Sequence, residues 1–255
     1  MSLEGFSIDY FEKNIKHKKK RISGGINLVS TLDINNTHHF NMITLEQAGF
    51  AVTQINLLVA MYSAEYDKWE LKKELERAIS YIDQYWEPDV VRMSTGTGAR
   101  KKYYPIYYLS YTITMRWVLS LAVLLDCEVE QFNLLKSIID RDKIKDKIFD
   151  ILLSSKEPNR PISEEINPKK PANNLVEILR IENPKLLEDE LISYLRSDWL
   201  KTYRKSGIYN SHKAADRIPF VFNGYWAFEV AAIVKVLNLN VAKFKEIPFF
   251  PNRFF

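Results

Sequence analysis

The chain has 255 residues, of which 46% are hydrophobic and 27% charged, the balance of a globular protein with ample material for a core. A formal net charge of +4 falls well short of the concentrated positive charge of a dedicated nucleic-acid-binding protein. The single cysteine, Cys127, excludes an internal disulfide and indicates a reducing compartment, and a count of only 8 glycines argues against an all-β fold, which uses turn residues at short intervals.

No segment has the pattern of a signal peptide or of a membrane span. The segment 6–22 is interrupted by Asp9, Glu12 and a basic run, so it lacks the apolar stretch of a signal peptide. The longest apolar stretch, 117–125, is far shorter than the roughly 20 residues that a membrane helix needs. We therefore expect a cytoplasmic protein that does not contact a membrane.

The first half of the chain has the periodicity of helices. The stretch 45–63 is apolar on more than one side, so we expect a central helix there, with Thr44 as its N-cap. Apolar residues recur at three- and four-residue steps over 65–86, which predicts an amphipathic helix that Pro88 ends.

Further helices are predicted after a loop over 93–102. Pro105 is well placed in a first helical turn, so we expect it to open a helix over 106–125. Two shorter periodic segments, 129–139 and 144–153, follow it.

In the last third of the chain, four prolines in 154–174 predict an extended connection that is flexible or exposed. Helical periodicity resumes at 175–179 and again over 184–205, and a last helix is predicted over 224–239. The tail 247–255, IPFFPNRFF, contains two prolines and four phenylalanines and is expected to fold back onto the helices or to form a contact surface.

Together these segments predict an all-α fold, and no internal repeat of fixed period is present. We expect a bundle of two packed helical domains, one over residues 5–126 and the other over 127–255, the second containing the proline-rich connection.

A few residues are of the types found in catalytic, metal-binding or phosphate-binding sites. His38 and His39 are adjacent, but no second pair stands at the spacing of a zinc site. The glycines and basic residues of 96–102 lack the pattern GxxxxGK[ST], and Cys127 has no basic neighbour in the sequence that would lower its thiol pKa. The residues DKWELK at 67–72 match the acid and ExK residues of a metal-dependent nuclease, yet they lie within two turns of one predicted helix. We expect no catalytic residue, no metal and no cofactor.

Two alternative functions stay open on these grounds. The basic run 16–21 and the basic residues 100–102 could serve a nucleic-acid-associated helical regulator, since each neutralised phosphate releases counterions. No aromatic residue is interleaved with the run, and a solvated helix end is the simpler interpretation. The residues at 67–72 leave a metal-dependent nuclease as a further alternative.

The segment GYWAFE, at 224–229, is compact and aromatic. In the helix predicted there, Trp226 and four aliphatic residues form one stripe, and three alanines allow another helix to approach closely. Glu229 lies beside this packed face, where a carboxylate is costly unless it is hydrogen-bonded or ion-paired. We expect it to anchor the preceding loop through His212, Arg217 or backbone amides.

The pattern extends on both sides of GYWAFE, over residues 194–239. A Tyr-Leu helix ends near a tryptophan, a histidine lies in the following loop, and GYW is followed by a glutamate and by small alanines. In these features the segment resembles the C-terminal domain of the PoNi family of polymorphic nuclease immunity proteins. The residues that match the family pattern are Trp199, His212, Gly224, Tyr225, Trp226, Glu229, Ala231 and Ala232.

The N-terminal half resembles the companion domain of the same family, chiefly through 57–79, where a Tyr-Ser pair leads into a helix rich in Glu, Leu and Lys. The family often has a glycine soon after that pair, and this chain has Glu65 and Tyr66. The tail departs as well, because Asn252 and Arg253 stand where the family tends to show an aspartate. If that aspartate contributes to toxin binding, this chain has a different toxin partner.

The resemblance implies a non-enzymatic immunity protein that protects its producer in contact-dependent competition. It would bind and neutralise a cognate nuclease toxin, a DNase, by stoichiometric protein–protein interaction, without contacting nucleic acid itself. The spacing of the motif residues is that of helix packing and loop anchoring, so the toxin contact is expected elsewhere. One group of acidic residues could face a basic nuclease surface, with an ordinary solvated helix face as the alternative: Glu188, Asp189, Glu190 and Asp198.

Overall fold

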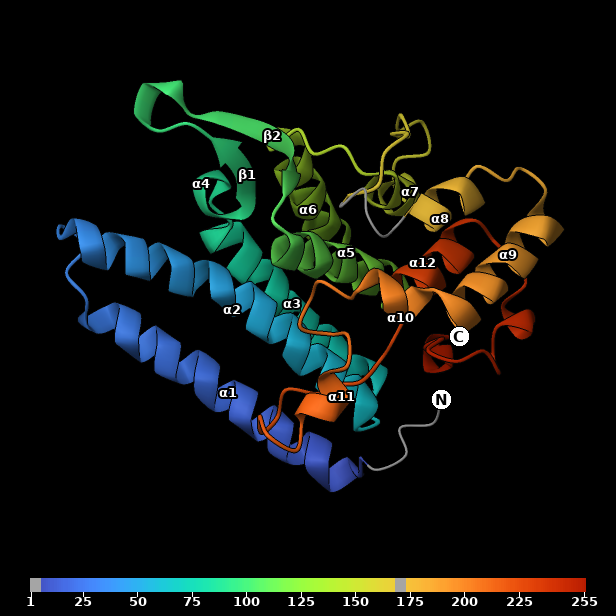
Figure 1. Cartoon of the computed structure of the whole chain (residues 1–255), viewed down its shortest axis with the longest axis horizontal. Helices are drawn as coiled ribbons and strands as arrows, with labels where there is room; N and C mark the ends of the chain where they lie inside the picture. Colours follow the sequence, from blue (N-terminus) through green and yellow to red (C-terminus); the bar gives the residue numbers. More distant parts are fainter. Residues whose placement is uncertain (1–5, 168–172) are drawn as a thin grey trace.

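The computed structural model describes residues 6–167 and 173–255, and helices dominate both ranges (Figure 1). The predicted all-α class is therefore confirmed, with one small two-stranded sheet among the described residues. The helices are α1 (Ile8–Thr31), α2 (Thr37–Ser63), α3 (Lys68–Tyr85), α4 (Pro88–Val91), α5 (Leu109–Leu124), α6 (Val129–Arg141), α7 (Lys147–Ser154), α8 (Asn173–Ile178), α9 (Pro184–Ser197), α10 (Trp199–Thr202), α11 (Ser211–Ala214) and α12 (Phe228–Val236). Three short 3₁₀ turns are η1 (Gly98–Arg100), η2 (Val241–Lys243) and η3 (Asn252–Phe254).

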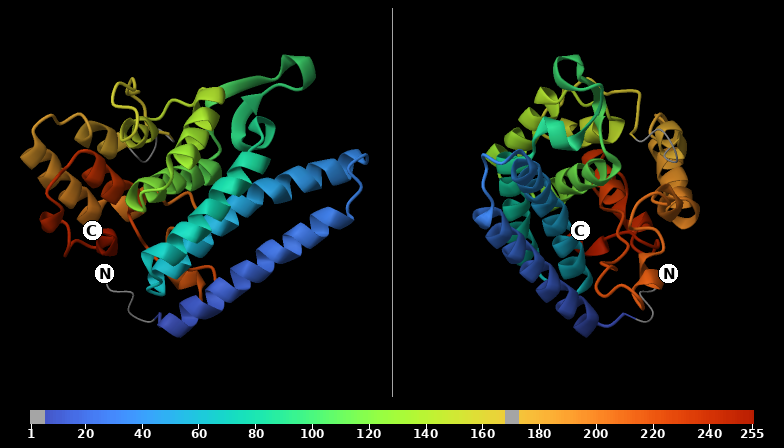
Figure 2. Two further views of the ribbon diagram at one scale, coloured as in Figure 1. Left: turned by 180° about the vertical axis from the view of Figure 1, so that it is seen from behind. Right: turned by 60° about the vertical axis from the view of Figure 1, so that its left-hand side comes forward.

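Helices α1 and α2 form a long antiparallel pair, in which α1 lies at the outside of the molecule and α2 lies between α1 and the other helices (Figure 2). The prediction of Thr44 as the N-cap of the second helix was wrong. Helix α2 begins earlier, because the side chain of Asn36 accepts hydrogen bonds from the backbone N–H groups of His38 and His39. The helix predicted over 65–86 is confirmed as α3, and Asp67 caps it.

The region 92–107 forms a β-hairpin, where a loop and the start of a helix were predicted. Strands β1 (Arg92–Thr95) and β2 (Lys102–Tyr107) pair antiparallel, with Ser94 opposite Tyr103. Pro105 lies within β2, and α5 begins only at Leu109. Tyrosines favour extended backbone, and a two-stranded ribbon tolerates proline because each strand has a free edge. The hairpin extends beyond the helices in both Figure 1 and Figure 2.

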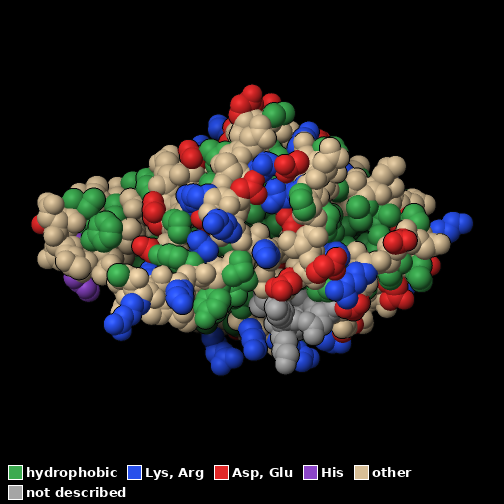
Figure 3. Space-filling model, turned by 90° about the horizontal axis from the view of Figure 1, so that it is seen from above, with side chains coloured by type: hydrophobic (Ala, Val, Ile, Leu, Met, Phe, Trp, Pro, Cys, Tyr) green, Lys and Arg blue, Asp and Glu red, His purple; other side chains and the backbone are tan. Residues whose placement is uncertain are grey.

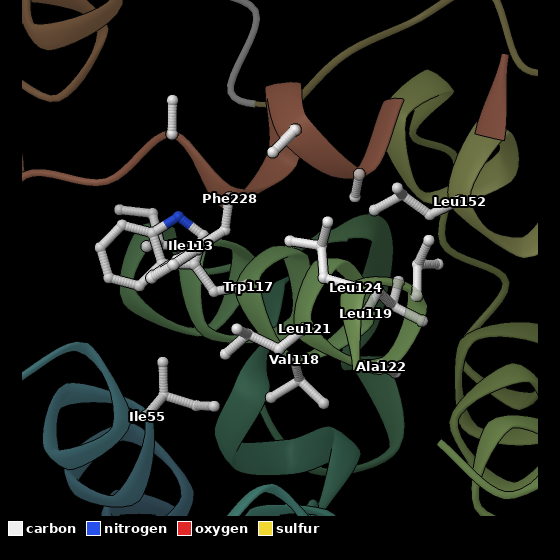
Figure 4. Packing of buried hydrophobic residues seen from close by; sticks show 14 of the residues in the cluster. Ile55, Ile113, Trp117, Val118, Leu119, Leu121, Ala122, Leu124, Leu152 and Phe228 are labelled. Carbon is white, nitrogen blue, oxygen red and sulfur yellow. The ribbon is translucent and has the colours of Figure 1, made fainter. Parts of the chain in front are cut away.

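Helix α5 lies at the centre of the molecule and is buried along nearly its whole length. It packs against α12 and α7 on one side and against α2 and α3 on the other. Figure 4 shows Phe228 of α12 beside Trp117 of α5, with Ile55 of α2 below them. The buried residues form one continuous core that crosses the expected boundary between 126 and 127, so the division into domains 5–126 and 127–255 stays a proposal.

The last helix, α12, begins at Phe228, so the prediction that it starts at Gly224 was wrong. The backbone N–H of Ala227 donates to the Phe249 carbonyl oxygen at 2.8 Å, which holds the residues before α12 in an extended course beside the tail. The tail folds back onto the helices, where Phe250 and Phe254 are buried. This outcome is one of the two expected for the tail.

The connection between α7 and α8 contains no helix or strand over its described part, 155–167. It is nevertheless held in place, because Arg160 forms an ion pair with Asp150 at 2.7 Å and the backbone N–H of Asn167 donates to Asp146 at 2.8 Å. Pro168 and Pro171 of the predicted connection lie outside the described residues. Within 6–167 and 173–255, no helix is long and apolar enough to cross a membrane.

Candidate functional site

One buried carboxylate, that of Glu229, joins three helical segments. Its side chain lies at the start of α12, and the residue is 1% exposed. Its Oε1 accepts hydrogen bonds from Trp199 Nε1 at 2.6 Å and from the Tyr203 hydroxyl at 2.8 Å. Its Oε2 accepts from Trp117 Nε1 of α5 at 3.2 Å. Glu229 thereby connects α5, α10 and α12 in the middle of the core.

Glu229 is hydrogen-bonded as expected, but the prediction of His212, Arg217 or backbone amides as its partners was wrong. The donors are two indoles and a phenol, which are apolar enough to be buried and still offer one polar hydrogen each. Burial and the neighbouring negative charge of Glu229 raise the pKa of Tyr203 well above its ordinary value, so the hydroxyl stays a donor. The arrangement has the features of a closed structural link and offers no access to a substrate.

Gly224 permits a close contact between the loop before α12 and the end of α2. Its φ of +114° is a backbone conformation that residues with a side chain rarely adopt. A Cβ atom at this position would collide with Ser63 Oγ. That hydroxyl accepts a hydrogen bond from Trp226 Nε1 at 2.8 Å and donates to the Asn223 carbonyl oxygen at 2.7 Å. The glycine and the tryptophan of the GYW sequence therefore act on the same serine.

The tyrosine and the histidine of the motif contact each other. The Tyr225 hydroxyl lies 2.6 Å from His212 Nδ1. Burial lowers the pKa of His212, which favours the neutral ring whose Nδ1 can accept the hydroxyl proton. Phe222 packs edge-on against Tyr225, with ring centroids 4.9 Å apart. This contact holds the loop that follows α10 against the segment before α12.

Replacing Trp226 with Ala is expected to lower the stability of the fold before it affects any partner. The ring packs edge-on against Tyr62 with centroids 4.8 Å apart, and its loss would also leave Ser63 without a donor. Because Trp226 is only partly buried, we expect a loss of about 2 kcal/mol, or roughly 4 to 8 °C in melting temperature. Trp69, which is 70% exposed, provides the matched control, and its change to Ala should leave the melting temperature nearly unchanged. An unchanged melting temperature for Trp226→Ala, together with lost toxin binding, would contradict this prediction.

The acidic residues considered for toxin contact divide into two environments. Glu188 is buried, and its carboxylate accepts from the Asn240 backbone N–H at 2.8 Å and pairs with Lys243 at 2.9 Å. Asp189 and Glu190 are exposed on α9, and Asp198 lies partly exposed just after it, 3.1 Å from Lys201. Of the four, Asp189, Glu190 and Asp198 are therefore accessible from the solvent, and Glu188 is not.

The residues of the alternative nuclease and nucleic-acid interpretations have structural contacts of their own. Asp67 accepts the Glu70 backbone N–H at 2.8 Å as a helix cap, and Lys72 pairs with Glu128 at 2.7 Å. The basic run lies in the middle of α1 and not at a helix end, so the expectation of a solvated helix end was wrong in its position. Its side chains are exposed except that of Lys18, and Arg21 forms an ion pair with Glu46.

The remaining candidate residues stay apart from one another. Among the described residues, no three His, Cys, Asp or Glu side chains are placed to hold a metal ion, and this includes His38 and His39. Cys127 is buried near Lys72 and Lys156, and burial outweighs their charges and raises its thiol pKa to about 11. The thiol therefore stays protonated at neutral pH.

Comparison with known proteins identifies a family over both halves of the chain. The family described as PoNe immunity protein (PoNi), N-terminal, matches residues 6–137, and the family described as PoNe immunity proteins (PoNi), C-terminal, matches residues 144–254. No curated protein sequence matches the chain.

A similar fold is found in the crystal structure of protein PA2201 from Pseudomonas aeruginosa, with a TM-score of 0.64. The two chains are 15% identical, and the likeness covers 95% of this chain and 86% of that one. This likeness shows a shared fold alone. The two family matches confirm the resemblance found in the sequence, and the chain belongs to the PoNi family of PoNe immunity proteins.

Proposed function

We propose that this protein binds the nuclease domain of a cognate toxin and neutralises it as a stoichiometric inhibitor, with no turnover. The observation that carries the proposal is the pair of family matches, which together span residues 6–137 and 144–254. An immunity protein of this kind needs a stable scaffold and a complementary surface, and it needs no catalytic group. Affinity would come from a few well-packed anchor residues within a larger interface.

In this proposal, the buried residues around the GYWAFE segment support the scaffold. Glu229 is 1% exposed, and Trp199 is fully buried, so a partner cannot touch either side chain while the protein stays folded. Their hydrogen bond joins α10 to α12. We infer that these residues fix the relative positions of the helices that present the toxin-binding surface.

For that surface we propose the exposed acidic residues of α9, Asp189 and Glu190, together with Asp198. A nuclease that binds DNA carries basic surface, to which acidic side chains are complementary. In Figure 3, acidic and basic side chains are interspersed over the central part of the face shown, so the net positive charge does not form one continuous basic area there. Asp189 lies 3.4 Å from Lys243 and Asp198 lies 3.1 Å from Lys201, so a basic partner would compete with these lysines and would find Glu190 beside them.

The first experiment identifies the adjacent reading frame, which we expect to encode a nuclease toxin, and co-expresses its product with this protein. We expect the protein to protect the cells from growth arrest and to co-purify with the toxin's nuclease domain. Unprotected cells and failure to co-purify at equal expression would contradict the proposed function.

A second experiment tests the proposed surface separately. Charge reversal of Asp189→Lys with Glu190→Lys is expected to slow association with the toxin by roughly tenfold at low salt, since charge complementarity acts mainly on the association rate. The matched control reverses two other exposed glutamates, Glu76→Lys with Glu130→Lys on α3 and α6, and so changes the net charge equally. Equal slowing by both double variants would exclude a local role for α9 and leave only a general charge effect.

A further inference from the structure

A cavity of about 500 Å³ lies between α2, the first half of α5 and the loop that precedes α12. It has the size of a small-molecule site, and such sites form preferentially where separate parts of a chain meet. Lys18 of α1 and residues of the loop after α10, including Lys205, complete its lining.

The walls of the cavity are mainly apolar. Val52, Ile55 and Val59 come from one face of α2, and Ile113 and Trp117 face them from α5. These side chains are spaced at three- or four-residue steps, so each helix presents apolar residues to the cavity on successive turns. Asn56 of α2 and Ser110 and Thr114 of α5 add polar groups to the same walls. An apolar ligand would gain free energy by leaving water for such walls.

The charge of the lining has one sign. Lys18 and Lys205 are its charged residues, and no Asp or Glu stands among the described residues that form it. Lys205 is exposed, whereas Lys18 is 9% exposed. A cavity that carries only positive charge favours an anionic ligand over a neutral or cationic one.

The ammonium group of Lys18 lacks a counter-charge. It donates to the Phe220 carbonyl oxygen at 3.3 Å, and no carboxylate among the described residues forms an ion pair with it. An ammonium group has three protons to donate, and burying it unpaired is costly. Burial lowers the pKa of Lys18 to about 8, so the group is still largely charged at neutral pH. An anion in the cavity would relieve this cost.

The kind of anion follows from the donors. Phosphate sites usually combine arginine side chains with several backbone N–H groups, and the lining contains no arginine. A single buried lysine matches a singly charged headgroup. We propose that the cavity binds a small apolar carboxylic acid, whose carboxylate pairs with Lys18 and whose hydrocarbon part packs between α2 and α5. This proposal does not depend on the toxin.

The test is isothermal titration of the full chain with decanoate, decan-1-ol and decylamine at neutral pH. We expect saturable 1:1 binding of decanoate, with at least tenfold weaker binding of the alcohol and the amine. Equal affinity for all three ligands, or no binding of decanoate, would overturn the proposal.

Two variants locate the site. Lys18→Met keeps the stem of the side chain and removes its charge, so it should weaken decanoate binding at least tenfold, whereas Lys19→Met, at an exposed neighbouring position, should leave it unchanged. Ser110→Trp fills the cavity from an exposed position on α5 and should abolish binding even if Lys18→Met does not fold. Full-affinity decanoate binding by folded Ser110→Trp would contradict the proposed location.

Discussion

Replacement of Glu229 by Ala is expected to lower the free energy of unfolding by roughly 5 kcal/mol. The change leaves three buried donors without an acceptor, on Trp117, Trp199 and Tyr203. Each unsatisfied buried donor costs about 1 to 3 kcal/mol, and the missing side-chain atoms leave a void in addition. A loss of this size is a large fraction of the total free energy of unfolding of a natural protein, which is about 5 to 15 kcal/mol.

Denaturant unfolding measures this effect, and two further variants serve as references. Glu229→Gln keeps one carbonyl acceptor and should lose less stability than Glu229→Ala, because only part of the hydrogen bonding is removed. Glu190→Ala, on the exposed face of α9, should change the free energy of unfolding by no more than about 0.5 kcal/mol. If Glu229→Ala were as stable as Glu190→Ala, the central role of the carboxylate would be refuted.

Gly224→Ala is expected to destabilise the protein by about 3 kcal/mol. Part of the loss comes from the φ of +114°, since such a backbone strains any residue with a side chain by about 1 to 3 kcal/mol. The new methyl group would also collide with Ser63 Oγ and approach Trp226 Nε1 at 2.7 Å, which disrupts their hydrogen bond. Thermal unfolding of the purified variant measures the sum of both effects.

The matched control is Gly207→Ala in the loop after α10. A Cβ atom at Gly207 would meet no other atom within 4 Å, so the change should be nearly neutral. Ser63→Ala alone removes the acceptor of the Trp226 indole, and in Gly224→Ala it also removes the collision with Oγ, while the backbone strain and the contact with Trp226 stay. The loss in the double variant should therefore be smaller than the sum of the losses in the two single variants. A loss in the double variant equal to that sum would show that the clash with Ser63 contributes nothing.

The helices with a clear three- and four-residue periodicity could be predicted from the sequence. The helix predicted over 65–86 corresponds to α3, and the one predicted over 129–139 corresponds to the greater part of α6. Both could be predicted because each helix buries one apolar stripe against a neighbouring helix. The prediction that Pro105 opens a helix was wrong. Proline suits a first helical turn and an exposed strand equally, and only the pairing of β1 with β2 decides between them.

The candidate site was harder to predict than the helices. A buried role for Glu229 followed from its place beside apolar residues, but its donors stand 26, 30 and 112 positions away in the chain. No local spacing connects a glutamate with an indole 112 residues earlier. The same reason applies to Ser63, which meets Trp226 from 163 positions away. Contacts of this length depend on how whole helices pack, and only the fold establishes them.

Stoichiometric neutralisation is tested most directly by titrating the toxin's nuclease domain with this protein. The nuclease is held well above the dissociation constant, and cleavage of supercoiled plasmid in Mg²⁺ is followed, with the protein alone as a control for cleavage of its own. We expect activity to fall linearly to zero at one equivalent, independently of incubation time, and no cleavage in the control. Full nuclease activity at several equivalents, or inhibition that grows with time at a small fraction of an equivalent, would contradict the proposed function.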